Sequence, residues 1–259
     1  MARNLGFSVG LMTAIAASAA MPNVSLRRLD CGRFVTKQLT DSCYLVEHNG
    51  TYLLWDAGLG TELIGRPQGQ GTRGWIELNT TLADQLKRIG LVPHDIAILA
   101  LSHTHFDHIG QAPEFSNARL LIGRQDWDAL VSAPASDERR VRLESWIEGI
   151  SSKKLITGDH DVYGDGSVVM IATPGHTPGH HSLLVRLHTM GPVLLTGDLY
   201  NSAQQFAENS VPPNNSDPAA TVSSFVHFRK LAHDLNATVI IQHEPADISK
   251  LPAFPQAAQ

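Results

Sequence analysis

Cysteine, charge and long apolar runs are all scarce in this sequence, and each shortage excludes a class of protein. Only Cys31 and Cys43 are present, and neither has another soft ligand nearby, so a cysteine-based metal site is not expected. Charged residues make up 17% of the chain and the formal net charge is −5, which gives no support for nucleic-acid binding. Beyond the N-terminus no apolar run is long enough to cross a membrane, so stable membrane insertion is not expected either.

The N-terminal residues 1–20 predict a secretory signal. Arg3 supplies a weak positive charge, the segment from Leu5 to Ala17 is mostly apolar and small, and Ala17-Ser18-Ala19 fits an A-x-A cleavage site. Residues 21–259 are then expected to form a single domain of a periplasmic or secreted protein. The alternative is an alanine-rich start of a cytoplasmic protein. Export would allow the two cysteines to form a disulfide. Two buried free thiols are the other interpretation, and the sequence does not decide between them.

Histidine is the residue that stands out, because six of the 13 fall in two short windows. The first window follows an apolar run that predicts a buried strand, and it reads Leu101-Ser102-His103-Thr104-His105-Phe106-Asp107-His108. Four metal-capable side chains within six residues favour a metal site over a histidine-rich surface loop. His103 and His105 can bind one ion, and Asp107 and His108 can bind a second.

Two later loops also place metal-capable residues at the ends of predicted strands. One reads Thr173-Pro174-Gly175-His176-Thr177-Pro178-Gly179-His180-His181, and the other reads Gly197-Asp198-Leu199-Tyr200. His243 ends the last predicted strand. Ligands that gather at strand ends can meet at one edge of a sheet.

Other elements follow from turn residues and periodicity. Asn49-Gly50 predicts a two-residue hairpin turn. The glycine-rich stretch from Thr61 to Trp75 is expected to be a loop that borders the substrate site. Residues 137–150 are expected to form one helix. Asp217-Pro218 opens a final helix, whose apolar face is expected to comprise Val222, Phe225, Val226, Phe228, Leu231 and Leu235.

The pattern H-x-H-x-D-H, followed by T-P-G-H-T and G-D, resembles the metallo-β-lactamase superfamily over roughly residues 43–245. The resemblance implies an α/β fold: a four-layer αββα sandwich of two mixed β-sheets flanked by helices. It implies that Asp198 bridges two ions. It also implies that Asp56, in Asp56-Ala57-Gly58, and His180 support the ligands without binding the ions themselves. A plain turn residue is the alternative for Asp56. The implied ligands are His103, His105, Asp107, His108, His176, Asp198 and His243.

Within that superfamily the local patterns are most similar to the N-acyl homoserine lactonase branch. This implies a dinuclear metal-dependent hydrolase that opens a lactone ring, N-acyl homoserine lactone above all, through a hydroxide generated at the metal pair. Asp107 would carry a proton to the leaving alkoxide. Tyr200 would donate a hydrogen bond to the lactone carbonyl oxygen. Since Tyr200 stands one residue closer to Asp198 than in the familiar pattern, a tyrosine packed at a strand end is the alternative.

Other functions remain as alternatives. A glyoxalase II-like thioesterase, or another ester hydrolase, is disfavoured because the chain has T-P-G-H instead of T-P-C-H and no added C-terminal helical domain. A β-lactamase is disfavoured because those enzymes lack the bridging aspartate. A non-enzymatic metal-binding module is disfavoured because no ligand is missing. Zinc is the expected metal, while iron, manganese and cobalt suit the same ligands. Many relatives form homodimers, and no feature of this sequence decides the oligomeric state.

Overall fold

The fold consists of two packed β-sheets. The computed structural model describes residues 22–66, 68–70 and 74–259, so the predicted signal at residues 1–20 lies outside the described residues. The strands of the larger sheet are β1 (Val24–Phe34), β2 (Leu39–His48), β3 (Thr51–Trp55), β4 (Gln68–Gln70), β5 (Gly74–Glu77), β6 (Ile96–Ala100), β7 (Arg119–Gly123) and β8 (Lys153–Ile156). Those of the smaller sheet are β9 (His160–Asp161), β10 (Val168–Ala172), β11 (His181–Leu187), β12 (Gly191–Leu195) and β13 (Thr238–Ile240).

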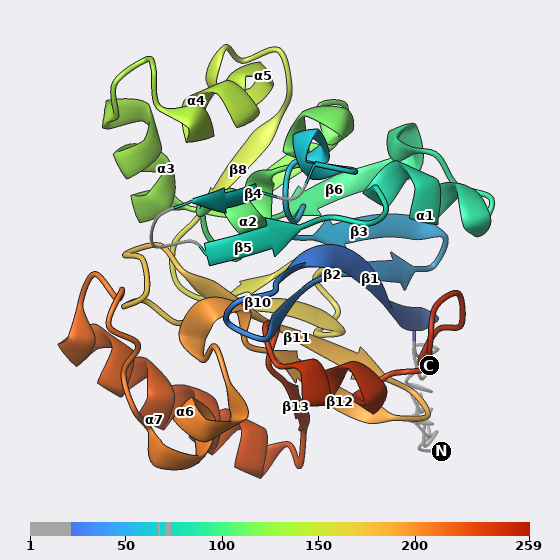
Figure 1. The fold of residues 1–259 in the computed structure, drawn as a ribbon. Helices are drawn as coiled ribbons and strands as arrows, with labels where there is room; N and C mark the ends of the chain where they lie inside the picture. The colour runs from blue at the N-terminus through green and yellow to red at the C-terminus, as the bar shows by residue number, and fades with distance from the viewer. Residues whose placement is uncertain (1–21, 67, 71–73) are drawn as a thin grey trace, which may run out of the picture.

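Both sheets are mixed. The larger runs in the order β4-β5-β1-β2-β3-β6-β7-β8 and the smaller in the order β13-β12-β11-β10-β9 (Figure 1). β1, β2 and β3 pair antiparallel, whereas β3, β6, β7 and β8 pair parallel. In the smaller sheet only the β12–β13 pair is parallel. Parallel neighbours bring their carboxyl ends to one edge, and the loops that carry the ligands start there.

Helices cover the outer face of each sheet. They are α1 (Leu82–Arg88), α2 (Phe106–Ile109), α3 (Arg124–Ser132), α4 (Glu138–Arg142), α5 (Glu144–Ile147), α6 (Ala203–Glu208) and α7 (Pro218–Asp234). Figure 1 shows α3, α4 and α5 on the side of the larger sheet that faces away from the smaller sheet, and α7 on the outer side of the smaller sheet. No helix within the described ranges is both long and apolar enough to span a bilayer.

Three hydrophobic clusters separate these four layers. One joins α1, α3 and α5 to the outer face of the larger sheet, including Leu86, Trp127 and Trp146. The second lies between the two sheets, where Trp55 and Met170 meet. The third lies between the smaller sheet and α7, around Phe225 and Phe228. The predicted αββα sandwich is therefore confirmed.

Local turn chemistry explains several element boundaries. Asn49 and Gly50 both adopt positive φ between β2 and β3, as the predicted two-residue turn requires. Thr81 caps α1 by accepting a hydrogen bond from the Asp84 amide. A β-bulge at Cys31 shifts the β1–β2 register, and Cys31 forms a disulfide with Cys43 across the two strands. The structure thus selects the disulfide over free thiols.

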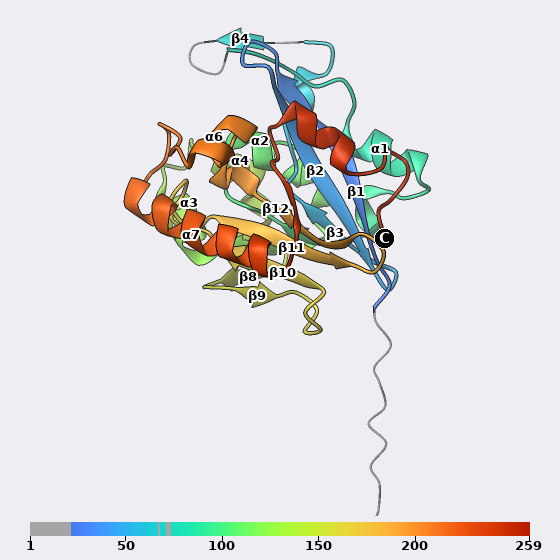
Figure 2. The same cartoon turned by 90° about the horizontal axis from the view of Figure 1, so that it is seen from below.

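Several predictions of local structure need correction. The stretch from Thr61 to Trp75 is not a plain loop, because β4 and the start of β5 lie in it and extend the sheet edge that projects in Figure 2. Residues 137–150 form two short helices, because Leu143 leaves the helical conformation at φ −112°. Val222 and Val226 on α7 are exposed, so they do not belong to its apolar face.

Candidate metal centre

The loop that follows β6 carries the first four histidine and aspartate side chains of the site. His103 and His105 precede the single-turn helix α2, which presents Asp107 and His108. Gly110 ends this turn so close to the chain that follows β3 that a Cβ atom would lie 2.3 Å from the Gly60 amide nitrogen. Its own N–H donates to the Gly58 carbonyl oxygen at 2.7 Å. The β6 loop is therefore fixed against the turn that begins with Asp56.

Asp56 is buried and accepts hydrogen bonds from three different elements. Its Oδ1 accepts from the Ser102 amide at 2.7 Å. Its Oδ2 lies 2.8 Å from the Ser102 hydroxyl and 2.9 Å from both His108 Nδ1 and Gln242 Nε2. Because Nδ1 of His108 carries the proton that Asp56 accepts, its Nε2 is left as a lone pair that faces the site.

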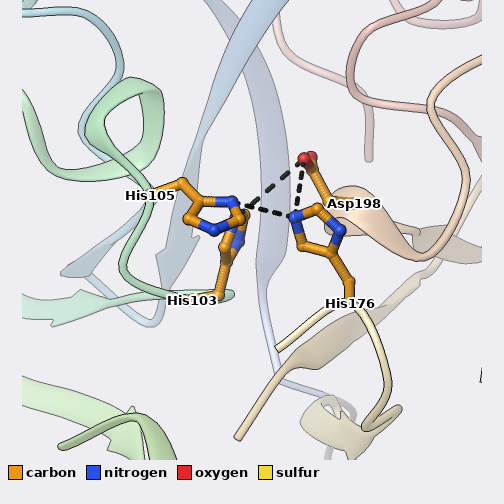
Figure 3. Close-up of side chains that lie close together, drawn as sticks. All are labelled: His103, His105, His176 and Asp198. Atoms are coloured by element: carbon orange, nitrogen blue, oxygen red, sulfur yellow. Dashed lines mark hydrogen bonds and ion pairs between the residues drawn. The ribbon is translucent and has the colours of Figure 1, made fainter. Parts of the chain in front are cut away.

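One group of four ligand atoms meets where the β6 loop, the β10–β11 loop and the loop after β12 converge. Figure 3 shows the rings of His103, His105 and His176 turned toward each other and toward the Asp198 carboxylate. His105 Nδ1 lies 2.9 Å from Nε2 of both His103 and His176. His176 Nε2 lies 3.2 Å and His103 Nε2 3.9 Å from Asp198 Oδ2. Four ligands around a tetrahedral zinc ion stand about 3.3 Å apart, so these separations fit one.

A second group faces the other oxygen of the same aspartate. It comprises Asp107, His108 and His243. Asp198 Oδ1 lies 3.2 Å from His108 Nε2 and 2.9 Å from His243 Nε2. Asp107 Oδ2 lies 3.9 Å from His108 Nε2 and 3.8 Å from His243 Nε2. The two oxygens of Asp198 therefore point into two adjacent groups, which is the arrangement of a bridging carboxylate.

The outer nitrogens of His176 and His243 are already used in hydrogen bonds. His176 Nδ1 pairs with Asn215 Oδ1 at 3.0 Å, and His243 Nδ1 pairs with the Thr40 carbonyl oxygen at 2.8 Å. A proton fixed on the outer nitrogen leaves the inner one as an acceptor, which is the form that binds a metal.

His180 lies behind the ligands and belongs to neither group. Its Nε2 accepts from the Asp198 amide at 3.0 Å, and its Nδ1 lies 2.9 Å from the Thr173 hydroxyl. Gly197 adopts φ +55°, and a Cβ atom there would lie 2.7 Å from His180 Nε2. His180 thus fixes the backbone of Asp198 through the hydrogen bond that it accepts from the Asp198 amide.

Burial and neighbouring charges shift several pKa values in this cluster. Burial lowers the pKa of His105 to about 4, helped by the neighbouring His176. Burial opposes a charged His243, but the Asp198 carboxylate outweighs it and raises the pKa of His243 to about 9. Burial likewise opposes a charged Asp198, and the surrounding imidazoles, led by His243, still hold its pKa well below the usual range.

The residues present fit a pair of cations. His108 Nε2 and Asp198 Oδ1 are buried, and neither has a hydrogen-bond partner within the described residues. They lie 3.2 Å apart, and although burial opposes a charged His108, the carboxylates of Asp198, Asp56 and Asp107 raise its pKa. These carboxylates favour positive charge at this point, and a metal cation can supply it in place of the proton. Imidazole nitrogen and carboxylate oxygen are ligands that divalent transition metals accept.

A cavity of about 580 Å³ opens beside both groups. His105, Asp107, Asp198 and His243 line its inner end. The other walls come from the β1–β2 turn, the start of α2 and the segment around α6: Phe34, Lys37, Leu39, Phe106, Asn201, Ser202, Gln205, Pro212, Pro213 and Asn214. No described residue of the stretch 61–75 lines it, but residues 67 and 71–73 lie outside the described residues, so a border with the site stays a prediction for this stretch.

Tyr200 is not part of this cavity. Its side chain is fully buried, and its ring stacks on Phe225 with centroids 4.3 Å apart. Burial raises the pKa of Tyr200 to about 12 in spite of the nearby Arg229. The structure corrects the predicted hydrogen bond to a substrate, because the side chain points into the core between the smaller sheet and α7. This is the alternative that its spacing from Asp198 had left open.

Several supporting residues escaped the sequence analysis. Ser102, Gln242 and Asn215 each bond to a ligand or to Asp56, but no motif distinguishes such polar residues from ordinary loop residues. Asp41 is fully buried, its carboxylate oxygens have no hydrogen-bond partner within the described residues, and burial raises its pKa. Asp41 lies two residues from both Leu39 and Cys43, so on a strand it shares a face with apolar side chains, and this position could have marked it as unusual.

Comparison with known proteins agrees with this geometry. A model of the metallo-beta-lactamase superfamily matches residues 38–243. N-acyl homoserine lactonase AttM of Rhizobium radiobacter is 32% identical over 228 residues, which cover 82% of this chain and 85% of the relative. An N-acyl homoserine lactonase of a Bacillus species is 32% identical over 221 residues, which cover 83% of this chain and 85% of the relative.

Among solved structures, the chain is similar to a mutant of B. thuringiensis AiiA with N-decanoyl-L-homoserine bound at the active site. The TM-score is 0.76 at 25% identity, and the match covers 92% of this chain and 100% of that one. The chain belongs to the metallo-β-lactamase superfamily.

Proposed function

We propose that the protein is a dinuclear metal-dependent hydrolase that opens the lactone ring of N-acyl homoserine lactones, and so quenches quorum signals. The observation that carries the proposal is Asp198, whose two oxygens face two adjacent groups of ligands. Relatives over four-fifths of the chain are N-acyl homoserine lactonases. A structural neighbour holds N-decanoyl-L-homoserine at its active site.

His103, His105, His176 and Asp198 would hold one ion, and Asp107, His108, His243 and the same Asp198 would hold the other. Zinc is the metal we propose, since tetrahedral nitrogen and oxygen sites suit it. Two such ions would lower the pKa of bound water and polarise a carbonyl group. Iron, manganese and cobalt are the alternatives that metal analysis would detect.

The residues of the chain perform the remaining tasks. Asp107 lines the cavity beside His243, so its carboxylate can pass a proton to the ring oxygen as the C–O bond breaks. Phe34, Leu39 and Phe106 offer an apolar wall for an acyl chain. Asp56 and His180 hold the ligands from behind and so keep the reacting groups in position.

The direct test measures proton release by the purified protein, loaded with metal, after addition of short- and long-chain N-acyl homoserine lactones. We expect rapid acidification that a chelator abolishes. No acidification, from protein shown to contain about two metals per chain, would reject the lactonase. Thioesters and β-lactams assayed in parallel would then identify the glyoxalase II-like or β-lactamase alternative.

We also propose that the protein is exported. The Cys31–Cys43 disulfide supports this, since such bonds persist in oxidising compartments. Cell fractionation and N-terminal sequencing of the full chain test it, and an intact N-terminus on cytoplasmic protein would contradict it. A homodimer stays a prediction that light scattering of the purified protein can check.

A further inference from the structure

The cavity wall next to Asp198 contains an amide side chain that has no role so far. Asn201 follows Asp198 by three residues and lines the same cavity. Its backbone N–H donates to Gln205 Oε1 at 2.8 Å, which ties the residue to the first turn of α6. This side chain is therefore held on a fixed backbone beside the ligand groups.

The backbone explains why Asn201, and not Tyr200, faces the cavity. Tyr200 has extended dihedrals, φ −136° and ψ 136°. Successive side chains on an extended backbone point to opposite sides. Because the ring of Tyr200 enters the core against Phe225, the next side chain turns outward to the cavity.

The amide of Asn201 is oriented with its donor toward the cavity. Its Oδ1 is buried and has no hydrogen-bond partner within the described residues, whereas its Nδ2 is neither buried nor bonded there. The two N–H groups of Nδ2 are thus available to an acceptor atom in the cavity.

The other polar side chains of this wall are less suited. The Ser202 hydroxyl accepts from the Gln205 amide as the cap of α6. Lys37 is exposed and lies over the ring of Phe34. Asn214 is exposed. Asn201 is half-buried and lies only three residues after Asp198 in the chain.

We infer that Asn201 binds the carbonyl oxygen of the lactone through Nδ2, an inference that rests on the proposed function. When the water oxygen bonds to the carbonyl carbon, an electron pair of the C=O bond moves onto the carbonyl oxygen. The C=O bond re-forms as the ring C–O bond breaks and the ring oxygen takes a proton. A fixed N–H donor stabilises the charge between these two events. Unlike a tyrosine hydroxyl, an amide keeps its protons at high pH.

The test compares Asn201→Ala and Asn201→Asp with the parent protein at equal metal content. Asn201→Asp keeps the shape and removes the donor, so both variants should lose kcat roughly 10- to 100-fold with little change in KM. The loss should be the same for N-hexanoyl homoserine lactone and for a simple γ-lactone without the acyl amide. Gln204→Ala removes an exposed amide of α6 that does not line the cavity, so it is the matched control and should keep its kcat.

Binding gives a second measurement that does not depend on turnover. The corresponding γ-lactam presents the same carbonyl oxygen without being hydrolysed, and calorimetry should show its Kd raised about fivefold in Asn201→Ala. Unchanged kcat and Kd would overturn the inference, as would a loss confined to the N-acyl substrate. A parent protein that holds two metals but opens neither lactone rejects the proposed function, and the lactam affinity still decides the role of Asn201.

Discussion

A histidine lies beside a carboxylate near each end of β3, with very different results. His48, the last residue of β2, lies opposite the start of β3, where it pairs with Asp165 at 2.7 Å and stacks on Tyr163 with ring centroids 3.8 Å apart. At its end, Asp56 holds His108, which belongs to a cluster of five histidines and two aspartates. Near the start of β3 the two side chains satisfy one another, whereas beyond its end the ligand atoms of several side chains converge on one space.

The difference shows what distinguishes a metal site from a structural histidine. Asp165 also accepts hydrogen bonds from the amide and hydroxyl of Ser167, so its lone pairs are used within the protein. At the other end, the Nε2 atoms of His108 and His243 converge on Asp198 Oδ1 at 3.2 and 2.9 Å, and the second oxygen of Asp198 faces another group of ligands. Convergence of unused lone pairs, more than the presence of histidine, marks the site that fits cations.

The largest expected effect comes from removing a bridging or shared ligand. Asp198→Ala would leave both groups without their common carboxylate, and His103→Ala would open the first group. We expect either change to cost several kcal/mol of transition-state stabilisation, roughly 10³-fold or more in kcat/KM, and to lower the metal content. Elemental analysis and the lactone assay measure both. His48→Ala, at the closed end, should keep its metal. Full activity in a metal-depleted sample would contradict the scheme.

The disulfide is expected to make the next largest contribution, and it lies beside the metal end of β3. The cysteines are 12 residues apart, and Cys31 packs against Gly58 in the turn that begins at Asp56. Replacing both cysteines by alanine should lower the free energy of unfolding by about 3 kcal/mol. Urea denaturation measures this, and the parent protein under reductant should behave like the variant. An unchanged unfolding midpoint would show that the bond does not stabilise the fold.

Asp56→Ala tests whether the carboxylate behind the ligands is needed for metal binding. Without it, the Nδ1 proton of His108 loses its acceptor and the ring is free to turn. We expect metal affinity to fall about 10- to 100-fold, measured by competition with a coloured chelator. Asp165→Ala, at the other end of β3, serves as the control and should leave metal affinity unchanged. Equal affinities for the two variants would make Asp56 a turn residue only.

The sequence predicted more of the site than of its surroundings. Spacing pointed to the four ligands of the loop after β6, and the resemblance to the superfamily added His176, Asp198 and His243. The structure places all seven in two adjacent groups. The predicted role of Tyr200 was wrong because the direction of a side chain after a turn depends on the backbone. On the extended backbone found here, a shift of one residue turns the side chain to the opposite side. The pairing of β4 with β5 was missed because short edge strands rich in glycine carry no periodic pattern.

The smallest expected effect lies at the closed end of β3. Hydrogen bonds from Ser167 and His48 hold the pKa of Asp165 at about 2 despite some burial. Because this pKa is below its usual value, Asp165 stabilises the fold above about pH 4, and the contribution disappears as the pH falls toward 2.

Asp165→Asn should therefore lower the free energy of unfolding by about 1 kcal/mol at neutral pH, a figure reduced for partial solvent exposure. Urea titrations of the metal-free proteins at pH 7 and near pH 2 measure the difference, which should shrink at the lower pH. A difference that stays constant would show that packing, and not the charge of Asp165, holds His48 in place. Metal content should be the same in both proteins, since this pair shares no residue with the metal centre.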